Sequence, residues 1–323
     1  MSKLTVVTGA AGFIGSNVVA TLNQRGNDQL LLVDALGTDD KWKNLLGTRY
    51  EDLISPAEYL AQIQSGKAAI PDAIIHLGAC SATTERDADY LLRNNYQYTR
   101  TLCEWSLQHG VRFVYASSAA TYGDGAQGYS DEDAATPGYR PLNMYGYSKH
   151  LFDLWALKAT VLPKIVGLKY FNVYGPHEDY KGDMRSVIHK AHGQIKQTGV
   201  VQLFKSCKPG YADGAQQRDF IYVKDVVDVT LHFVEQRHIG GLFNCGTGAA
   251  RTWKDLVSAT FRAMGKEPNI EFIDMPPTLR QKYQYFTQAQ TAKLRSQGQY
   301  QAAFTSLEAG ITDYVRNYLE LAT

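Results

Sequence analysis

The sequence predicts a doubly wound α/β fold, in which helices cover both faces of a parallel sheet, with a smaller α+β lobe towards the C-terminus. Three observations lead to this expectation. In the first half of the 323-residue chain, short β-branched runs alternate with helical stretches. Those runs are continuously apolar, as expected for parallel strands that are buried on both faces. The second half is less regular and mixes short strands, loops and helices.

The elements of the first half follow one another in an alternating order. Strands are predicted at 4–8, 29–34, 73–79, 112–118 and 164–171. Helices are predicted at 13–25, about 88–109 and about 145–160. Each helix is long enough to serve as the crossover that a pair of parallel strands requires.

The second half predicts a lobe that interleaves with the larger unit. A loop-rich stretch at 172–186 leads to a helix near 186–198, a polar loop at 205–217, a strand and helix within 218–236, and a strand at 241–248. We expect residues 1–172 and 224–250 to form the larger unit, and residues 173–223 and 251–323 to form the lobe. Ligands of such sheets bind at the C-terminal ends of the strands, where the lobe is expected to close.

Composition excludes several function classes. The net charge of +1 gives no electrostatic basis for binding nucleic acid or a membrane surface. The four cysteines are too widely spaced for a zinc knuckle or a CxxC pair, and no metal site is expected. Because there is neither a signal-like start nor an apolar run long enough to span a membrane, we expect a cytoplasmic protein.

A glycine motif follows the first predicted strand. The stretch "VVTGAAGFIGSN" contains Gly9, Gly12 and Gly15 at the spacing GxxGxxG and opens the first predicted helix. Glycines permit a tight turn and a close approach of backbone N–H groups to a pyrophosphate, which then faces the helix N-terminus. Glycines also serve plain turns, but the strand before and the helix after favour a dinucleotide-binding turn.

Two residues near the end of the second predicted strand bear on the identity of the dinucleotide. Asp34 is placed to bind the adenosine ribose hydroxyls, which is typical of NAD, although Asp is also a common turn residue. Lys41 could instead reach the 2′-phosphate of NADP. Asp52 is either a partner for the adenine amino group or an exposed acid. NAD and NADP therefore both stay open.

A tyrosine, a lysine and a serine form a catalytic pattern. Tyr145 and Lys149 are four residues apart on one predicted helix, so they share a face. We expect the ammonium to lower the pKa of the phenol and make it a usable base. Ser118 ends the strand at 112–118, where its hydroxyl can donate to a substrate oxygen. By chance alone YxxxK is frequent, but the conjunction with the glycine motif is specific.

Longer stretches extend this pattern over nearly the whole chain. They are "TGAAGFIGSN", "GACSATTERD", "NNYQYT", "YASSAATYG", "PLNMYGYSK", "YFNVYGP", "RDFIYVKDV", "FNCGTG" and "YQYFTQA". Together they resemble the extended short-chain dehydrogenase/reductase family of nucleotide-sugar enzymes, and in particular its branch that epimerises an ADP-linked heptose at C6″. The resemblance implies a Rossmann-type fold, a retained NADP (with NAD possible) and a homo-oligomer. It also implies the conversion of ADP-D-glycero-manno-heptose to ADP-L-glycero-manno-heptose for the lipopolysaccharide inner core.

The same resemblance implies roles for individual residues. The implied cofactor site comprises Gly9, Gly12, Phe13, Ile14, Gly15, Asp34, Ala35, Lys41, Leu77, Gly78, Ala79, Cys80, Ser81, Asn94, Tyr145, Lys149, Val173 and Lys181. The implied substrate site comprises Ser118, Asn172, Asp183, Lys190, Phe204, Arg218 and Tyr283. Ser118, Tyr145 and Lys149 correspond to the dehydrogenase triad, and Lys181 to a second acid–base group. Taken alone, Lys181 would be read as a solvated loop lysine.

Several positions depart from the family pattern. Ala35 replaces an Asn, and Pro56 stands where a lysine would assist with a 2′-phosphate, so both weaken the NADP assignment. Asp183 replaces a serine and Lys190 a histidine, with His189 adjacent. The 205–217 loop is longer than the family pattern.

Three alternative functions remain open from the sequence. The nearest is another nucleotide-sugar enzyme, a 4-epimerase or a 4,6-dehydratase, although "AATYG" after Ser118 lacks the acid pair that a dehydratase needs. The others are a cofactor-sensing binding protein without catalysis and a net dehydrogenase that releases reduced cofactor. The presence of both Tyr145 and Lys149 argues against the sensor.

Overall fold

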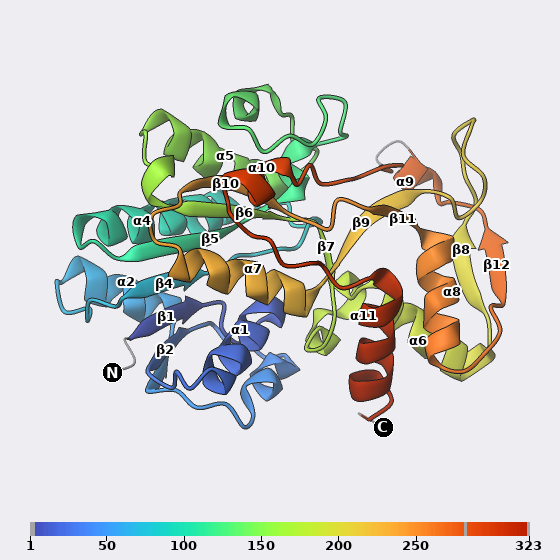
Figure 1. The fold of residues 1–323 in the computed structure, drawn as a ribbon, viewed down its shortest axis with the longest axis horizontal. Helices are drawn as coiled ribbons and strands as arrows, with labels where there is room; N and C mark the ends of the chain where they lie inside the picture. Colours follow the sequence, from blue (N-terminus) through green and yellow to red (C-terminus); the bar gives the residue numbers. More distant parts are fainter. Residues whose placement is uncertain (1–3, 281–282, 322–323) are drawn as a thin grey trace.

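The computed structural model of the chain describes residues 4–280 and 283–321. Its centre is a sheet of seven parallel strands in the order β10-β6-β5-β4-β1-β2-β3 (Figure 1). The strands are β1 (Thr5–Thr8), β2 (Leu30–Val33), β3 (Asp52–Ile54), β4 (Ala73–His76), β5 (Arg112–Ser118), β6 (Val166–Tyr170) and β10 (Gly241–Cys245). β1 and β4 are buried along their whole length, which explains their continuous apolar sequence.

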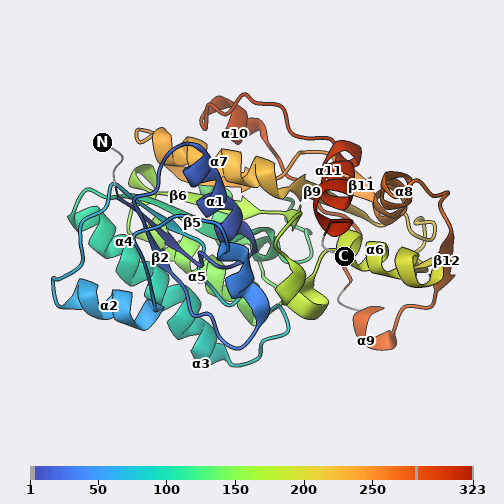
Figure 2. The same ribbon diagram turned by 90° about the horizontal axis from the view of Figure 1, so that it is seen from below.

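Helices cover both faces of this sheet (Figures 1 and 2). One face is covered by α1 (Phe13–Gln24) and α7 (Val223–Glu235), which pack on each other. The other face is covered by α2 (Pro56–Gln64), α4 (Tyr98–Gln108) and α5 (Met144–Lys158). The chain winds outward from β1 in both directions, so β1 and β4 flank the topological switch point at which ligands bind in such folds.

The lobe lies beside the C-terminal ends of these strands (Figure 1). It has a three-stranded sheet of β7 (Asn172–Tyr174), β9 (Gln217–Tyr222) and β11 (Ala250–Thr252), and a parallel pair of β8 (Val201–Phe204) and β12 (Ile270–Ile273). Its helices are α6 (Val187–Thr198), α8 (Trp253–Ala263), α9 (Pro277–Arg280) and α11 (Leu307–Tyr314), the last continued by a π-helix at Val315–Leu319. Between α9 and α11, α10 (Ala292–Ser296) returns to pack against β10 of the large sheet.

The predicted fold class is confirmed, and the structure refines the elements. β3 and α2 lie in a stretch for which the sequence predicted no element, so the large sheet has one strand more than expected there. The helix predicted at about 88–109 consists of α3 (Ala88–Leu91), a π-helical turn at Leu92–Gln97 and α4. The predicted loop-rich stretch at 172–186 contains β7 and a 3-10 helix at Asp179–Met184. Further 3-10 turns lie at Asp40–Leu45, Ala119–Tyr122, Asp133–Gly138 and Leu162–Lys164.

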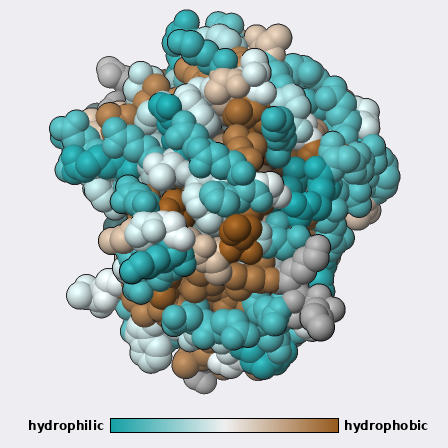
Figure 3. Space-filling view, turned by 90° about the vertical axis from the view of Figure 1, so that its left-hand side faces the viewer, coloured by the Kyte–Doolittle hydropathy of each residue, from teal (hydrophilic) through white to brown (hydrophobic). Residues whose placement is uncertain are grey.

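The surface bears mixed side chains. The face drawn in Figure 3 is mostly hydrophilic, with apolar residues in patches between the polar ones. Large hydrophobic side chains with high exposure, such as Leu46 and Ile70, are spread along the sequence rather than grouped in one segment. Within residues 4–280 and 283–321, no helix is both long and apolar enough to cross a membrane.

Candidate active site

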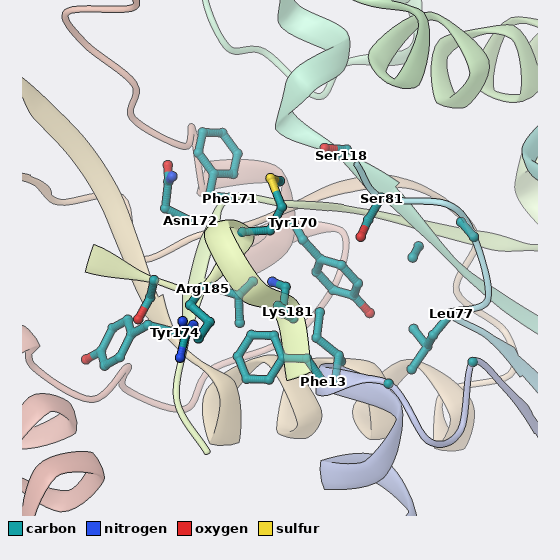
Figure 4. A pocket seen from close by; sticks show the side chains of 18 of the residues that line it. Phe13, Leu77, Ser81, Ser118, Tyr170, Phe171, Asn172, Tyr174, Lys181 and Arg185 are labelled. Atoms are coloured by element: carbon teal, nitrogen blue, oxygen red, sulfur yellow. The ribbon is translucent and has the colours of Figure 1, made fainter. Parts of the chain in front are cut away.

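A cavity of about 600 Å³ lies between the C-terminal ends of the sheet strands and the lobe (Figure 4). It brings together most of the predicted site. The predicted residues that line it are Gly9, Gly12, Phe13, Ile14, Gly15, Asp34, Lys41, Leu77, Gly78, Ala79, Ser81, Ser118, Tyr145, Lys149, Asn172, Val173 and Lys181. These residues come from widely separated segments and meet because parallel strands end at one edge of the sheet.

The glycine turn has the geometry of a phosphate cradle. Gly9 has φ +68°, and a Cβ atom there would lie 2.7 Å from the backbone nitrogen of Gly78. A Cβ on Gly15 would collide with the carbonyl oxygen of Gly9. α1 begins directly after Gly12, which places the N-terminus of the helix at the cavity. Glycine alone fits at positions 9 and 15, and the residues present therefore fit a dinucleotide pyrophosphate.

Asp34 and Lys41 form an ion pair at the rim of this turn. The Asp34 carboxylate accepts from the backbone N–H of Ala11 at 2.8 Å and pairs with Lys41 Nζ at 2.9 Å. Ala35 is exposed and does not line the cavity, and Pro56 begins α2. Asp52 is exposed on β3. Of the five positions considered for binding the adenosine part of the dinucleotide, only Asp34 and Lys41 line the cavity, and they are paired with each other.

Ser118 and Tyr145 meet at the end of β5 and the start of α5. Asn143 caps α5 by accepting from the N–H of Gly146 at 2.8 Å, which fixes where the helix starts and hence where Tyr145 points. Desolvation raises the pKa of Tyr145, and a hydrogen bond with Ser118 opposes that rise. The net shift is therefore upward rather than the expected lowering, because desolvation is its largest cause.

Lys149 is itself buried in the cavity wall. Desolvation lowers its pKa from 10.5 to about 8, while Asp153 raises it. Asp153 lies one turn further along α5 and forms an ion pair with Lys169 of β6 at 2.6 Å, with both side chains fully buried. Tyr115 and Ser117 donate to the same carboxylate, each at 2.8 Å. This network fixes α5 against β5 and β6 and thereby orients the Tyr145–Lys149 face.

Lys181 reaches the cavity from the 3-10 helix at Asp179–Met184. Its ammonium lies 5.0 Å from the centre of the Phe13 ring, and Figure 4 shows the two side chains together. Burial lowers the pKa of Lys181, and the Glu178 carboxylate opposes that shift. Lys181 is thus a half-buried cavity residue rather than a solvated loop lysine.

The remaining predicted cofactor residues lie behind the cavity wall. Asn95 accepts from the N–H of Cys80 and donates to its carbonyl oxygen, both at 2.9 Å. Asn94 donates to Asn95 at 3.0 Å. Cys80 is thus the one residue of the segment at 77–81 that does not line the cavity, and Asn94 is linked to it through Asn95 without lining the cavity either.

The predicted substrate residues are divided. Ser118 and Asn172 line the main cavity, whereas Asp183, Lys190, Phe204, Arg218 and Tyr283 do not. Lys190 Nζ donates to the carbonyl oxygen of Asp183 at 2.7 Å. The Arg218 guanidinium lies 5.7 Å from the Trp253 ring centre and 5.5 Å from that of Tyr283. Trp253 lines the main cavity, and Tyr283 lines a shallower one of about 490 Å³, so Arg218 stands between the two.

The shallower cavity involves the long loop at 205–217. Its lining residues are Cys207, Lys208, Pro209, Arg280, Tyr283 and Tyr285. The N–H of Cys207 donates to the Tyr285 hydroxyl at 2.9 Å, which attaches the loop to the segment that carries Tyr283. The loop therefore forms one wall of a cationic and aromatic surface beside Arg218.

The residues of the main cavity that sequence reasoning missed include Tyr180, Arg185 and Trp253. Tyr180 is adjacent to Lys181, and Arg185 follows four residues later, so proximity to that lysine was the available signal. Trp253 begins α8, and its sequence neighbours carry no comparable signal.

This fold and cavity define a dinucleotide-dependent enzyme with a serine–tyrosine–lysine set. Residues 5–246 match the model of the NAD dependent epimerase/dehydratase family. The chain is 56% identical over 320 residues to the ADP-L-glycero-D-manno-heptose-6-epimerase of Nitratidesulfovibrio vulgaris (strain DP4), covering 98% of each. It is 46% identical over 328 residues to the protein of the same name from Fusobacterium nucleatum, again covering 98% of each.

A solved structure agrees with these relatives. The crystal structure of Helicobacter pylori ADP-L-glycero-D-manno-heptose-6-epimerase superposes with a TM-score of 0.82 at 26% identity, covering 98% of this chain and 96% of that one. The chain belongs to the NAD dependent epimerase/dehydratase family and is an epimerase.

Proposed function

We propose that the protein inverts C6″ of ADP-D-glycero-manno-heptose to give ADP-L-glycero-manno-heptose, with a retained nicotinamide cofactor. One observation carries this proposal beyond the family: Tyr145 with Ser118, and Lys181 from a different segment, line the same cavity. Inversion at an exocyclic carbon by oxidation and reduction places the oxygen in two positions, so it calls for two acid–base groups. The names of the relatives support the choice of sugar.

The cofactor supplies reversible hydride transfer when it is bound. Tyr145 would take the proton of the C6″ hydroxyl, and Ser118 would donate a hydrogen bond to the same oxygen. Rotation about C5″–C6″ of the transient 6-ketone presents its other face and moves the oxygen. Lys181, whose pKa is lowered by burial, would return a proton to that oxygen in its new position, after which Tyr145 would lose its proton to solvent and Lys181 would regain one from it. Net redox change is zero.

We infer that NADP is the cofactor, with Lys41 as the partner of its 2′-phosphate. Lys41 lines the cavity, which supports this choice. A second candidate, NAD, is favoured by the Asp34–Lys41 pair, because that pair occupies the lysine and places a carboxylate at the ribose end. Homo-oligomerisation and use of the product in the lipopolysaccharide inner core complete the proposal and rest on family resemblance. The cytoplasmic location that the sequence predicts is also part of the proposal.

The test combines a product assay with identification of the cofactor. Purified protein is incubated with ADP-D-glycero-manno-heptose and with a panel of UDP-hexoses, and the products are separated from their epimers. We expect C6″ epimerisation of the ADP-heptose alone and a fall of ~10²- to 10⁴-fold in Tyr145→Phe. Mass analysis of the dinucleotide released from the protein decides between NADP and NAD. Turnover of a UDP-hexose with an inert ADP-heptose would contradict the proposal.

A further inference from the structure

Tyr180 places a hydroxyl group directly on the phosphate turn. Its oxygen accepts from the backbone N–H of Phe13 at 3.0 Å, across 167 residues of sequence. A Cβ atom on Gly12 would lie 3.4 Å from the same oxygen. Tyr180 also lines the main cavity. The first N–H of α1 therefore reaches the cavity through a tyrosine rather than directly.

The segment that carries Tyr180 is fastened to the turn by other contacts. Asn44 Nδ2 donates to the carbonyl oxygens of Ala11 at 3.0 Å and His177 at 3.2 Å, which joins turn and segment. His177 Nδ1 and Ser16 Oγ lie 2.9 Å apart, and Asn17 donates to the carbonyl oxygen of Pro176 at 3.0 Å. Because these bonds hold the backbone, removal of the Tyr180 hydroxyl should leave the segment in place.

The proton of the Tyr180 hydroxyl is available for a ligand. The oxygen uses a lone pair to accept from Phe13, and within the described part of the chain no acceptor for its own proton is recorded. Burial raises the pKa of Tyr180 to about 12, so the phenol keeps that proton at neutral pH. A neutral donor at the N-terminus of a helix, beside the tight turn at Gly9 and Gly15, suits an anionic oxygen.

We propose that Tyr180 is a cofactor-retention residue, whose hydroxyl donates to the pyrophosphate of the bound dinucleotide while the Phe13 N–H holds it in position. The inference rests on the proposed nicotinamide cofactor. It also explains why Tyr180 and Lys181 are adjacent, because one short segment then binds the cofactor and carries the second acid–base group. The opposite reading is that the hydroxyl occupies the place of a phosphate oxygen and is displaced by the cofactor.

Dissociation of the cofactor separates the two readings. Three proteins are compared: wild type, Tyr180→Phe and Tyr50→Phe, which changes an exposed tyrosine and serves as the control. Each is loaded with the reduced form of whichever dinucleotide is found to copurify with wild type. Release is followed by nicotinamide fluorescence after mixing with an excess of the oxidised form. Loss of a hydrogen bond to a charged acceptor predicts ~10- to 100-fold faster release from Tyr180→Phe and no change in Tyr50→Phe.

Unchanged or slower release of the cofactor from Tyr180→Phe overturns the inference and favours displacement of the Tyr180 hydroxyl by the cofactor. A wild type that binds neither NAD nor NADP overturns it together with the proposed function, whereas normal binding by all three proteins overturns the role of Tyr180 alone. A circular dichroism spectrum of Tyr180→Phe identical to wild type, with faster release, excludes a folding defect and supports the inference.

Discussion

Lys149 and Lys181 face one cavity, but two regions of different construction hold them. Lys149 lies on the regular helix α5, whose buried side is tied to the sheet by the Asp153–Lys169 ion pair. Lys181 lies on a short 3-10 helix that is interrupted at Gly182, where φ is 52°. The first region is a rigid element fixed along its length, and the second is a loop fixed at its ends.

The loop region also has a buried anchor, but of another kind. Glu178 is fully buried and accepts from the Ser186 N–H at 2.6 Å, the Ser186 hydroxyl at 2.5 Å and the Tyr314 hydroxyl at 3.0 Å. Asp153 is paired with a buried cation, whereas the partners of Glu178 are neutral. The helix that carries Tyr145, which is proposed to act at the first oxygen position, is therefore anchored by a buried ion pair. The segment that carries Lys181, which is proposed to act at the second position, is anchored by hydrogen bonds to neutral groups.

The largest effect should come from Lys181→Ala. We expect epimerisation in both directions to fall ~10²- to 10⁴-fold, because a general acid–base group is lost while Tyr145 and Ser118 remain. The rate is measured with each epimer of the ADP-heptose as substrate. Lys196→Ala, which removes an exposed lysine from the neighbouring helix α6, is the matched control. Near-wild-type epimerisation by Lys181→Ala would disprove the two-base mechanism. The regions that carry Lys149 and Lys181 would then differ in structure but not in a shared catalytic role.

The two anchors should differ in what they contribute to stability. Asp153→Asn leaves the Lys169 ammonium buried without its anion, which should cost ~3–5 kcal/mol of unfolding free energy. Glu178→Gln keeps one acceptor oxygen, and the hydrogen-bond partners of Glu178 are neutral, so its cost should be ~1–3 kcal/mol. Urea unfolding of both variants and of wild type measures the difference. Equal losses would mean that the two regions are supported in the same way.

The sequence was sufficient for the parts of the site that local rules determine. Ser118 ends a strand, and Tyr145 and Lys149 follow helical spacing, so a motif places all three without knowledge of the rest of the fold. The glycine turn was predictable for the same reason. Strand β3 was missed because it has only three residues and a partly exposed face.

Contacts between distant segments could not be predicted in this way. The bond between Tyr180 and Phe13 depends on how the 175–184 segment closes on α1, and no periodicity encodes that closure. The direction of the Tyr145 pKa shift was wrong because spacing identifies a charged neighbour but not the extent of desolvation. The cluster of Arg218, Trp253 and Tyr283 depends on tertiary structure. The register of β9 with β11 places Arg218 beside Trp253, and the 283–286 segment adds Tyr283.

The smallest effect is a pH dependence that originates at Lys149. In the folded, cofactor-free protein its pKa is about 8, against 10.5 ordinarily, so between these values the unfolded chain holds a proton that the folded one has lost. Stability therefore rises with pH across this window. Relative to Lys149→Met, wild type should gain about 3 kcal/mol on passing from pH 8 to 10.5, since one pKa unit corresponds to ~1.4 kcal/mol.

Urea unfolding of wild type and variant at several pH values measures this gain, and subtraction cancels the tyrosines and lysines that titrate in both proteins. Lys181→Met provides the counterpart from the loop region. The pKa of Lys181 is also lowered by burial and is opposed by Glu178, so its difference curve should rise in the same direction but by less, because the loop leaves the ammonium closer to water. A difference in unfolding free energy that does not change with pH for Lys149→Met, or that rises more steeply for Lys181→Met, would show that the helix does not desolvate its lysine more than the loop does. The two regions would then differ only in their anchors, Asp153 and Glu178.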